Sequence, residues 1–170
     1  FSLILTLPSA VALVVIPLPL VSVLFQRGAF GPEDTAATAI AVAIYGLGLP
    51  AFMLQKVYQP LFFAREDTKS PFRYAVVAMV VNAGLAFGLY PIVGWIAPAI
   101  AASAAGWAMV ALLATGARRM GDVARFDARF NRRAGRILAA SLIMGAALYA
   151  VLIPFGWVLA LPGWRYLGLL

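Results

Sequence analysis

The stretch YAVVAMVVNAGLAFGLYPIVGWIAPAIAASAAGWAMVALLATGA, Tyr74–Ala117, decides the fold, because it contains no charged side chain. A helix needs about 20 apolar residues to cross the ~30 Å hydrocarbon core of a bilayer. This stretch is too long for one such helix and has the length of two. Pro91 and Gly94 lie in its middle part, where they predict a tight turn. The pattern therefore predicts two membrane-spanning helices joined as a hairpin.

Three further runs without charge, at 1–26, 35–55 and 137–164, extend this pattern over most of the chain. Of the 170 residues, 64% are hydrophobic and 11% are charged, and the mean hydropathy is +0.96. This composition excludes a soluble globular domain. We expect an all-α integral membrane protein, a multi-pass transmembrane helix bundle of about five full spans and the start of a sixth. The predicted helices cover about 2–25, 33–63, 71–90, 98–117, 133–153 and 163–170.

Prolines predict where these helices deviate from a straight path. Pro17 and Pro19 predict a kink near the end of the first helix. Pro50 has no backbone N–H, and its ring clashes with the carbonyl group of Gly46, so we expect the second helix to be bent there, with a break in mid-span that could act as a hinge. Pro154 is expected to end the fifth helix.

The basic residues predict the orientation in the membrane. The loops on one side, 64–73 and 118–136, carry ten of them, whereas the loops on the other side carry only Arg27 and Arg165. The excess marks the first side as cytoplasmic. In the segment at about 122–132, apolar residues would share one side of a helix and arginines would share another side. This pattern predicts an amphipathic helix at the cytoplasmic interface, in contact with membrane lipids. Anchoring the topology is the favoured role of its arginines, ahead of substrate capture.

Lys56 is the only charged residue that is buried within a predicted span, away from the ends of its helix. Such a cation predicts a functional site that attracts an anionic group, with Gln55 and Gln59 as polar neighbours on the same helix. The alternative is a snorkelling lysine, because Arg65 lies nine residues on and the cytoplasmic end is only ~13 Å away. Asn82 is a further candidate for substrate contact.

Asn82, Ser103 and Trp107 also have a simpler interpretation. Buried polar side chains in membrane helices usually form hydrogen bonds with a neighbouring helix. We favour this interpretation for all three, and keep a substrate or cation contact as the alternative.

Several classes of function are excluded or disfavoured. The chain has no cysteine and no histidine, so thiolate and imidazole metal sites or catalytic groups cannot form within it. The acidic residues lie in loops or at helix starts, and no phosphate-binding glycine loop is present. We expect no catalytic residue, no metal and no cofactor, and therefore no enzyme. The net charge of +7 is spread between apolar runs, which disfavours nucleic-acid binding.

The chain begins at Phe1 within one apolar run and ends at Leu170 within another. A signal peptide would need a basic region and a small-residue cleavage site, and neither is present. We expect the chain to be an internal fragment of a longer protein.

Four motifs together carry a family resemblance: LPSAVAL at 7–13, LFQRGAF at 24–30, YGLGLP at 45–50 and FFAREDTKSP at 62–71. In this order and spacing they resemble the carboxy-terminal half of the MurJ/MviN family of lipid II flippases. Phe63 and Ser70 stand where Tyr and Thr are common in that family. The resemblance covers nearly the whole chain and weakens after about Arg119.

The resemblance implies a fourteen-helix, two-lobed transporter of the multidrug/oligosaccharidyl-lipid/polysaccharide exporter superfamily. Residues 1–170 would form part of its second lobe, from helix nine to the start of helix fourteen, with part of a lipid-tail groove in the last two helices. Such a protein moves lipid II, an anionic lipid-linked peptidoglycan precursor, from the inner to the outer leaflet of the bacterial cytoplasmic (inner) membrane by alternating access. Its implied partners are this substrate, membrane lipids and cell-wall synthesis proteins.

Two alternatives stay open at this point. A related exporter of another polyprenyl-linked oligosaccharide, or of a drug, would share the fold and topology. A membrane scaffold that transports nothing would need no polar cavity. Access of water to Lys56 and Asn82 would separate the scaffold from the transporters.

Overall fold

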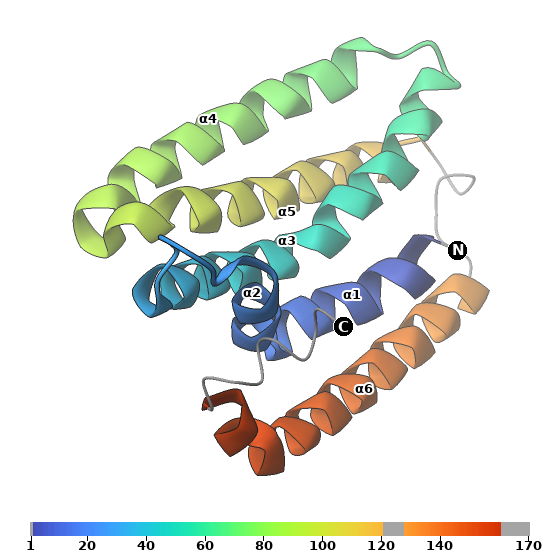
Figure 1. The fold of residues 1–170 in the computed structure, drawn as a ribbon. Helices are drawn as coiled ribbons and strands as arrows, with labels where there is room; N and C mark the ends of the chain where they lie inside the picture. The colour runs from blue at the N-terminus through green and yellow to red at the C-terminus, as the bar shows by residue number, and fades with distance from the viewer. Residues whose placement is uncertain (1, 121–127, 161–170) are drawn as a thin grey trace.

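The structure is a computed structural model, and it describes residues 2–120 and 128–160. Every regular element among these residues is helical, which confirms the all-α fold (Figure 1). The helices are α1 (Ser2–Val15), α2 (Pro17–Phe25), α3 (Pro32–Phe63), α4 (Lys69–Val93), the short 3₁₀ helix η1 (Gly94–Ile96), α5 (Ala97–Arg118) and α6 (Ala128–Ala160).

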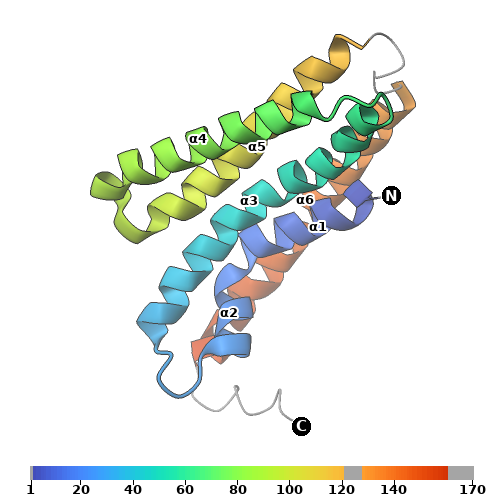
Figure 2. The ribbon, with the colours of Figure 1, turned by 90° about the horizontal axis from the view of Figure 1, so that it is seen from above.

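The long helices pack side by side in the order α4, α5, α3, α1 and α6 (Figures 1 and 2). α4 and α5 form the predicted antiparallel hairpin, and η1 is the turn between them. Gly94 has a φ of 61°, a backbone conformation that glycine adopts without strain, and its N–H bonds to the carbonyl of Tyr90. α2 folds back beside α3, and α1 separates α3 from α6.

A core of mostly apolar side chains joins α3 to α5. Phe62 and Leu113 are fully buried there, and Tyr74 of α4 meets Phe62 edge-on, with ring centroids 6.1 Å apart. The outward faces are equally apolar: Phe87 is 83% exposed and Ile92 is 77% exposed. Apolar surface on both the inside and the outside is what a bundle surrounded by lipid requires.

Three helical stretches among the described residues are long and apolar enough to cross a membrane: Pro32–Phe63, Lys69–Arg118 and Arg132–Pro154. The pair α1–α2 would be a fourth crossing if it is one broken span. The stretch Lys69–Arg118 is folded into the two antiparallel helices α4 and α5. The protein is therefore an α-helical integral membrane protein, and the count of five spans remains a prediction.

The predicted first helix, 2–25, is wrong as a single element. The chain bends by 84° between α1 and α2, and Ile16 at the bend has non-helical dihedral angles. Pro17 begins α2, and a proline disfavours the helical conformation of the residue before it. The expected kink is present, but it is a break and it lies at Ile16.

The expected break at Pro50 is also wrong, because α3 is one uninterrupted helix from Pro32 to Phe63. Two side chains of α5 donate to its backbone just before the proline: Ser103 Oγ to the Ile44 carbonyl at 2.8 Å, and Trp107 Nε1 to the Leu47 carbonyl at 3.0 Å. The carbonyl that loses its helical donor at Pro50 is that of Gly46, and these two bonds go to carbonyls on either side of it. They therefore attach the α3 backbone to α5 next to the proline.

The last third of the chain differs from prediction in a similar way. α6 begins at Ala128 and continues through Pro154 to Ala160, so Pro154 does not end the helix. The part of the expected interfacial helix from 128 to 132 belongs to α6, and its part from 122 to 127 lies outside the described residues. The expected sixth helix at 163–170 also lies outside them.

Two glycines allow α3 to approach its neighbours closely. A Cβ atom added to Gly46 would lie 3.1 Å from Leu13 Cβ and 3.3 Å from the Ala10 carbonyl oxygen of α1. A Cβ atom added to Gly48 would lie 2.8 Å from Ser103 Oγ and 3.3 Å from Ser103 Cα of α5. The segment around these glycines is therefore the point where α1 and α5 both contact the α3 backbone.

We predict that Gly48→Ala destabilises the protein by about 1–3 kcal/mol, because the added methyl group meets the α5 backbone. Gly84→Ala is the matched control, since nothing lies within 4 Å of its added Cβ and alanine favours a helix. Thermal unfolding of the detergent-solubilised full-length protein measures both. Equal stability of the two variants would show that the α3–α5 crossing is not tightly packed.

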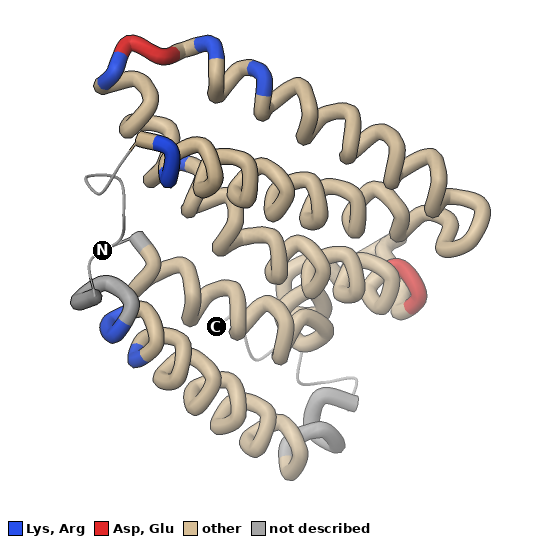
Figure 3. The backbone as a smooth tube through the Cα atoms, turned by 180° about the vertical axis from the view of Figure 1, so that it is seen from behind, with Lys and Arg blue, Asp and Glu red and all other residues tan. Residues whose placement is uncertain are grey.

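Apart from Lys56 within α3, the charged residues of the described chain gather at the ends of the bundle. The basic segments 65–73, 118–119 and 132–136 lie at one end, and the acidic start of α3 lies at the other (Figure 3). Arg65 donates to the Met120 carbonyl at 3.2 Å and so links the α3–α4 loop to the end of α5. At the start of α4, hydrogen bonds from the Ser70 side chain and backbone N–H lower the pKa of the Asp67 carboxyl.

We predict that the α3–α4 loop faces the cytoplasm and that the α4–α5 turn faces outward, because arginine and lysine resist translocation. Single cysteines at the exposed positions Thr68 and Ile92 test this, since residues 1–170 contain no native cysteine. In intact cells expressing an otherwise cysteine-free full-length protein, a membrane-impermeant thiol reagent should label Ile92→Cys and leave Thr68→Cys unlabelled. The opposite labelling would invert the topology.

Candidate functional site

Three of the four predicted site residues line one cavity, which we call the polar cavity. It lies between α3, α4 and α5 and has a volume of about 360 Å³. α3 contributes Gln55 and Gln59, and α4 contributes Asn82. The remaining lining is apolar: Phe52, Ala75, Ala78, Met79, Ala102, Ala105, Gly106 and Met109. The structure thus places on one cavity wall carboxamide side chains that are far apart in the sequence.

Gln55 is fixed in this cavity by helix packing. Its Nε2 donates to the Gly106 carbonyl of α5 at 3.0 Å, which leaves its Oε1 available as an acceptor. The absence of a side chain at Gly106 leaves room for the Phe52 ring, because an added Cβ atom would lie 2.9 Å from that ring. Gln55 is therefore both a contact between α3 and α5 and part of the cavity wall.

Gln59 and Asn82 complete the polar wall from two different helices. Both side chains are half-buried, and each carboxamide carries two N–H donors and one carbonyl acceptor. The favoured interpretation of Ser103 and Trp107 as hydrogen-bonding partners of a neighbouring helix is confirmed by their bonds to the α3 backbone. Asn82 differs from them, since it lines a cavity.

Lys56 lies outside the polar cavity. Its side chain is exposed on α3, whereas its sequence neighbour Gln55 and its helical neighbour Gln59 line the cavity wall. Residues three apart on a helix have Cβ atoms about 5–6 Å apart, so Lys56 and Gln59 lie on adjoining parts of the α3 surface. The arrangement separates the cationic group from the neutral carboxamides.

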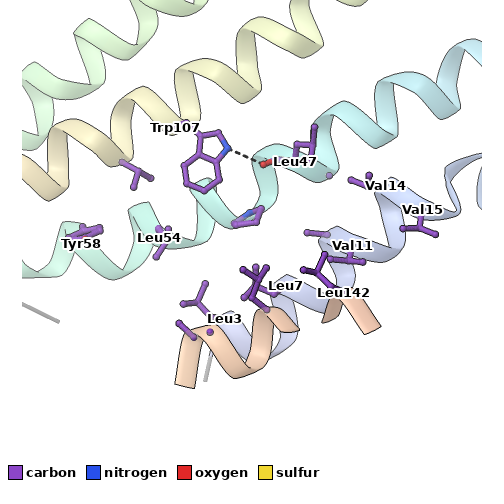
Figure 4. Close-up of a pocket in the computed structure, with 17 residues that line it drawn as sticks. Leu3, Leu7, Val11, Val14, Val15, Leu47, Leu54, Tyr58, Trp107 and Leu142 are labelled. Carbon is purple, nitrogen blue, oxygen red and sulfur yellow. Dashed lines mark hydrogen bonds between the residues drawn. The ribbon is translucent and has the colours of Figure 1, made fainter. Parts of the chain in front are cut away.

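A second cavity, the apolar cavity, lies on the other side of the contact between α3 and α5. It has a volume of about 650 Å³ and is bounded by α1, α3, α5 and α6 (Figure 4). Trp107 and Tyr58 carry the only side-chain polar groups in its wall, and the Trp107 N–H is bound to the Leu47 carbonyl. Its lining is Leu3, Leu7, Ala10, Val11, Val14, Val15, Gly46, Leu47, Pro50, Leu54, Tyr58, Trp107, Val110, Ala134, Gly135, Leu138 and Leu142.

The apolar cavity could not be predicted from the sequence, because no local pattern marks it. Leucine, valine and alanine at helical spacing predict packing in every membrane helix, and only the tertiary arrangement leaves space between them.

The two cavities differ in their chemistry. The apolar cavity accommodates hydrocarbon, and the polar cavity accommodates neutral hydrogen-bonding groups. Among the described residues, no group of three or more His, Cys, Asp or Glu side chains could hold a metal ion.

Comparison with known proteins gives a consistent result. The family model described as "Lipid II flippase MurJ" matches residues 1–167. The chain is 45% identical over 149 residues to a protein of Rhizobium meliloti (strain 1021) and 41% identical over 148 residues to one of Rhizobium tropici, both described as "Probable lipid II flippase MurJ". These alignments cover 88% and 87% of this chain and 28% of each relative.

A solved structure supports the same relationship. It is described as "Lipid II flippase MurJ, inward closed conformation", and it is 29% identical to this chain with a TM-score of 0.77. The match covers 88% of this chain and 30% of that protein. The chain therefore spans less than a third of the length of the relatives that it matches.

Proposed function

Because this chain belongs to the MurJ family of lipid II flippases, we propose that the protein to which it contributes moves lipid II from the inner to the outer leaflet of the bacterial cytoplasmic membrane. The match of the family model over residues 1–167 is the observation that carries this proposal. No bond is made or broken in such a step, so the protein acts as a transporter and needs no catalytic residue.

The chain would supply part of the second lobe of this transporter. A transporter that alternates between inward-facing and outward-facing states presents a polar surface to its substrate in the middle of the bilayer. The polar cavity and Lys56 are the parts of this chain with suitable chemistry. The rest of the longer protein would supply the opposite wall and the remaining contacts, including any with cell-wall synthesis proteins.

Lys56 would attract the pyrophosphate of the substrate. An ammonium group inside the membrane is costly unless water or an anion reaches it, and an exposed position on α3 allows both. Gln55, Gln59 and Asn82 would bind neutral parts of the same headgroup, because uncharged carboxamides give directional hydrogen bonds without an excess of charge.

We predict that Lys56→Gln impairs function and that Lys56→Arg largely preserves it, because arginine keeps the positive charge. The assay is growth of cells depleted of their own flippase and complemented with full-length variants at matched membrane abundance. Normal growth with Lys56→Gln would identify Lys56 as a snorkelling residue and remove it from the substrate contacts.

Reconstitution tests the function itself. Full-length protein in vesicles should move fluorescent lipid II between leaflets, and protein-free vesicles should not. Transport of other polyprenyl-linked oligosaccharides in preference to lipid II would indicate a related exporter. Absence of any transport, with complementation dependent only on abundance, would indicate a scaffold.

A further inference from the structure

We propose that the polar cavity between α3, α4 and α5 is a subsite for the neutral sugar portion of the lipid-linked substrate. This inference rests on the proposed flippase function and assigns a specific part of the substrate to a specific part of the chain. It is carried by the composition, size and position of the cavity wall.

The wall has hydrogen-bonding groups and no charge. Gln55, Gln59 and Asn82 are its only side chains with nitrogen or oxygen atoms, and all three are carboxamides. A pyrophosphate would need cationic partners, and charged ends of a peptide would need ions of opposite sign. Sugar hydroxyl groups both donate and accept, which is the complement of a carboxamide. The neutral sugar therefore fits this wall better than the charged parts of the substrate.

The three carboxamides also have different roles. Gln55 already donates to the Gly106 carbonyl, so its Oε1 remains as a fixed acceptor. Gln59 and Asn82 contribute their donors and acceptors from two helices, α3 and α4. A ligand held by a group on each helix is fixed in orientation, which a single polar residue would not achieve.

The apolar part of the wall suits a sugar ring as well. Phe52, Met79 and Met109 line the cavity beside the carboxamides. A pyranose ring has polar edges and a face of C–H groups, so it needs both kinds of surface. The volume of about 360 Å³ lies near the lower end of the range for small-molecule sites, roughly 300–1,000 Å³, which suits a single ring rather than a long chain.

Lys56 lies in the correct place for the neighbouring phosphate. It is exposed on α3, three residues before Gln59, with Cβ atoms about 5–6 Å apart on an ideal helix. A sugar in the cavity would therefore leave its linked phosphate outside the cavity, near the ammonium group. On α3 the carboxamides of Gln55 and Gln59 would thus face the sugar, and the ammonium group of Lys56 would face the phosphate that is joined to it.

Two probes of different headgroup test this inference in the full-length protein in nanodiscs. One is lipid II, and the other is the same polyprenyl pyrophosphate without sugar. The double variant Gln59→Met/Asn82→Leu removes polar groups while it keeps similar volume. We expect its affinity for lipid II to fall at least tenfold and its affinity for the sugarless lipid to stay within twofold of the parent protein. Thr115→Val is the control, because the Thr115 hydroxyl bonds to the local Leu112 carbonyl of its own helix, and the variant should bind both probes normally.

The outcomes separate the inference from the function on which it rests. Unchanged binding of both probes by the double variant would overturn the sugar subsite and leave the flippase function intact. An equal loss for both probes would also overturn it, because the carboxamides would then act through the packing of the bundle. Failure of the parent protein to bind or move lipid II would overturn the proposed function itself.

Discussion

The close contact of α3 with α1 and α5 around residues 44–50 is the constraint on which the rest of the structure depends. Gly46 brings the α1 backbone to α3, and Gly48 brings the α5 backbone to α3. Ser103 and Trp107 then donate to α3 carbonyl groups on either side of Gly46. In lipid, where apolar side chains gain little from leaving the solvent, close backbone approach and such hydrogen bonds are the main sources of helix association.

This contact also separates two chemically different spaces. Leu54 and Tyr58 of α3, with Val110 of α5, face the apolar cavity, whereas Gln55 and Gln59 of α3, with Met109 of α5, face the polar cavity. One pair of helices thereby forms a wall of both. The α3–α5 pair places an apolar and a hydrogen-bonding surface back to back, as the proposed lipid-linked substrate would require.

The helices and their hairpin could be predicted because they depend on local properties. Runs without charge set the positions of the membrane helices, and the segment from Pro91 to Gly94 set the turn between α4 and α5. The hydrogen bonds of Ser103 and Trp107 could be expected from the cost of burying a polar group in lipid. Their acceptors could not, because these belong to a helix more than 50 residues away. The same long-range bonds attach the α3 backbone to α5 just before Pro50.

The candidate site was predicted in part for the same reason. Gln55, Gln59 and Asn82 are unusual polar residues within apolar helices, so composition alone singles them out. Their convergence on one cavity depends on how α4 lies against α5 and α3, and Lys56 lies outside that cavity because of its angular position on α3. The apolar cavity had no signal in the sequence, since its residues are typical of any membrane helix.

Hydrogen–deuterium exchange of the full-length protein in nanodiscs measures whether the hydrogen bonds from α5 stabilise the α3 helix around residues 44–51. The comparison is between the parent protein and the double variant Ser103→Ala/Trp107→Phe. We expect faster exchange in the α3 segment 44–51 of the variant, because its carbonyl groups lose the hydrogen bonds from α5. Exchange in the middle of α4 should stay unchanged. Equal exchange of segment 44–51 in both proteins would contradict this expectation, and would show that this part of α3 is stable without the hydrogen bonds from α5.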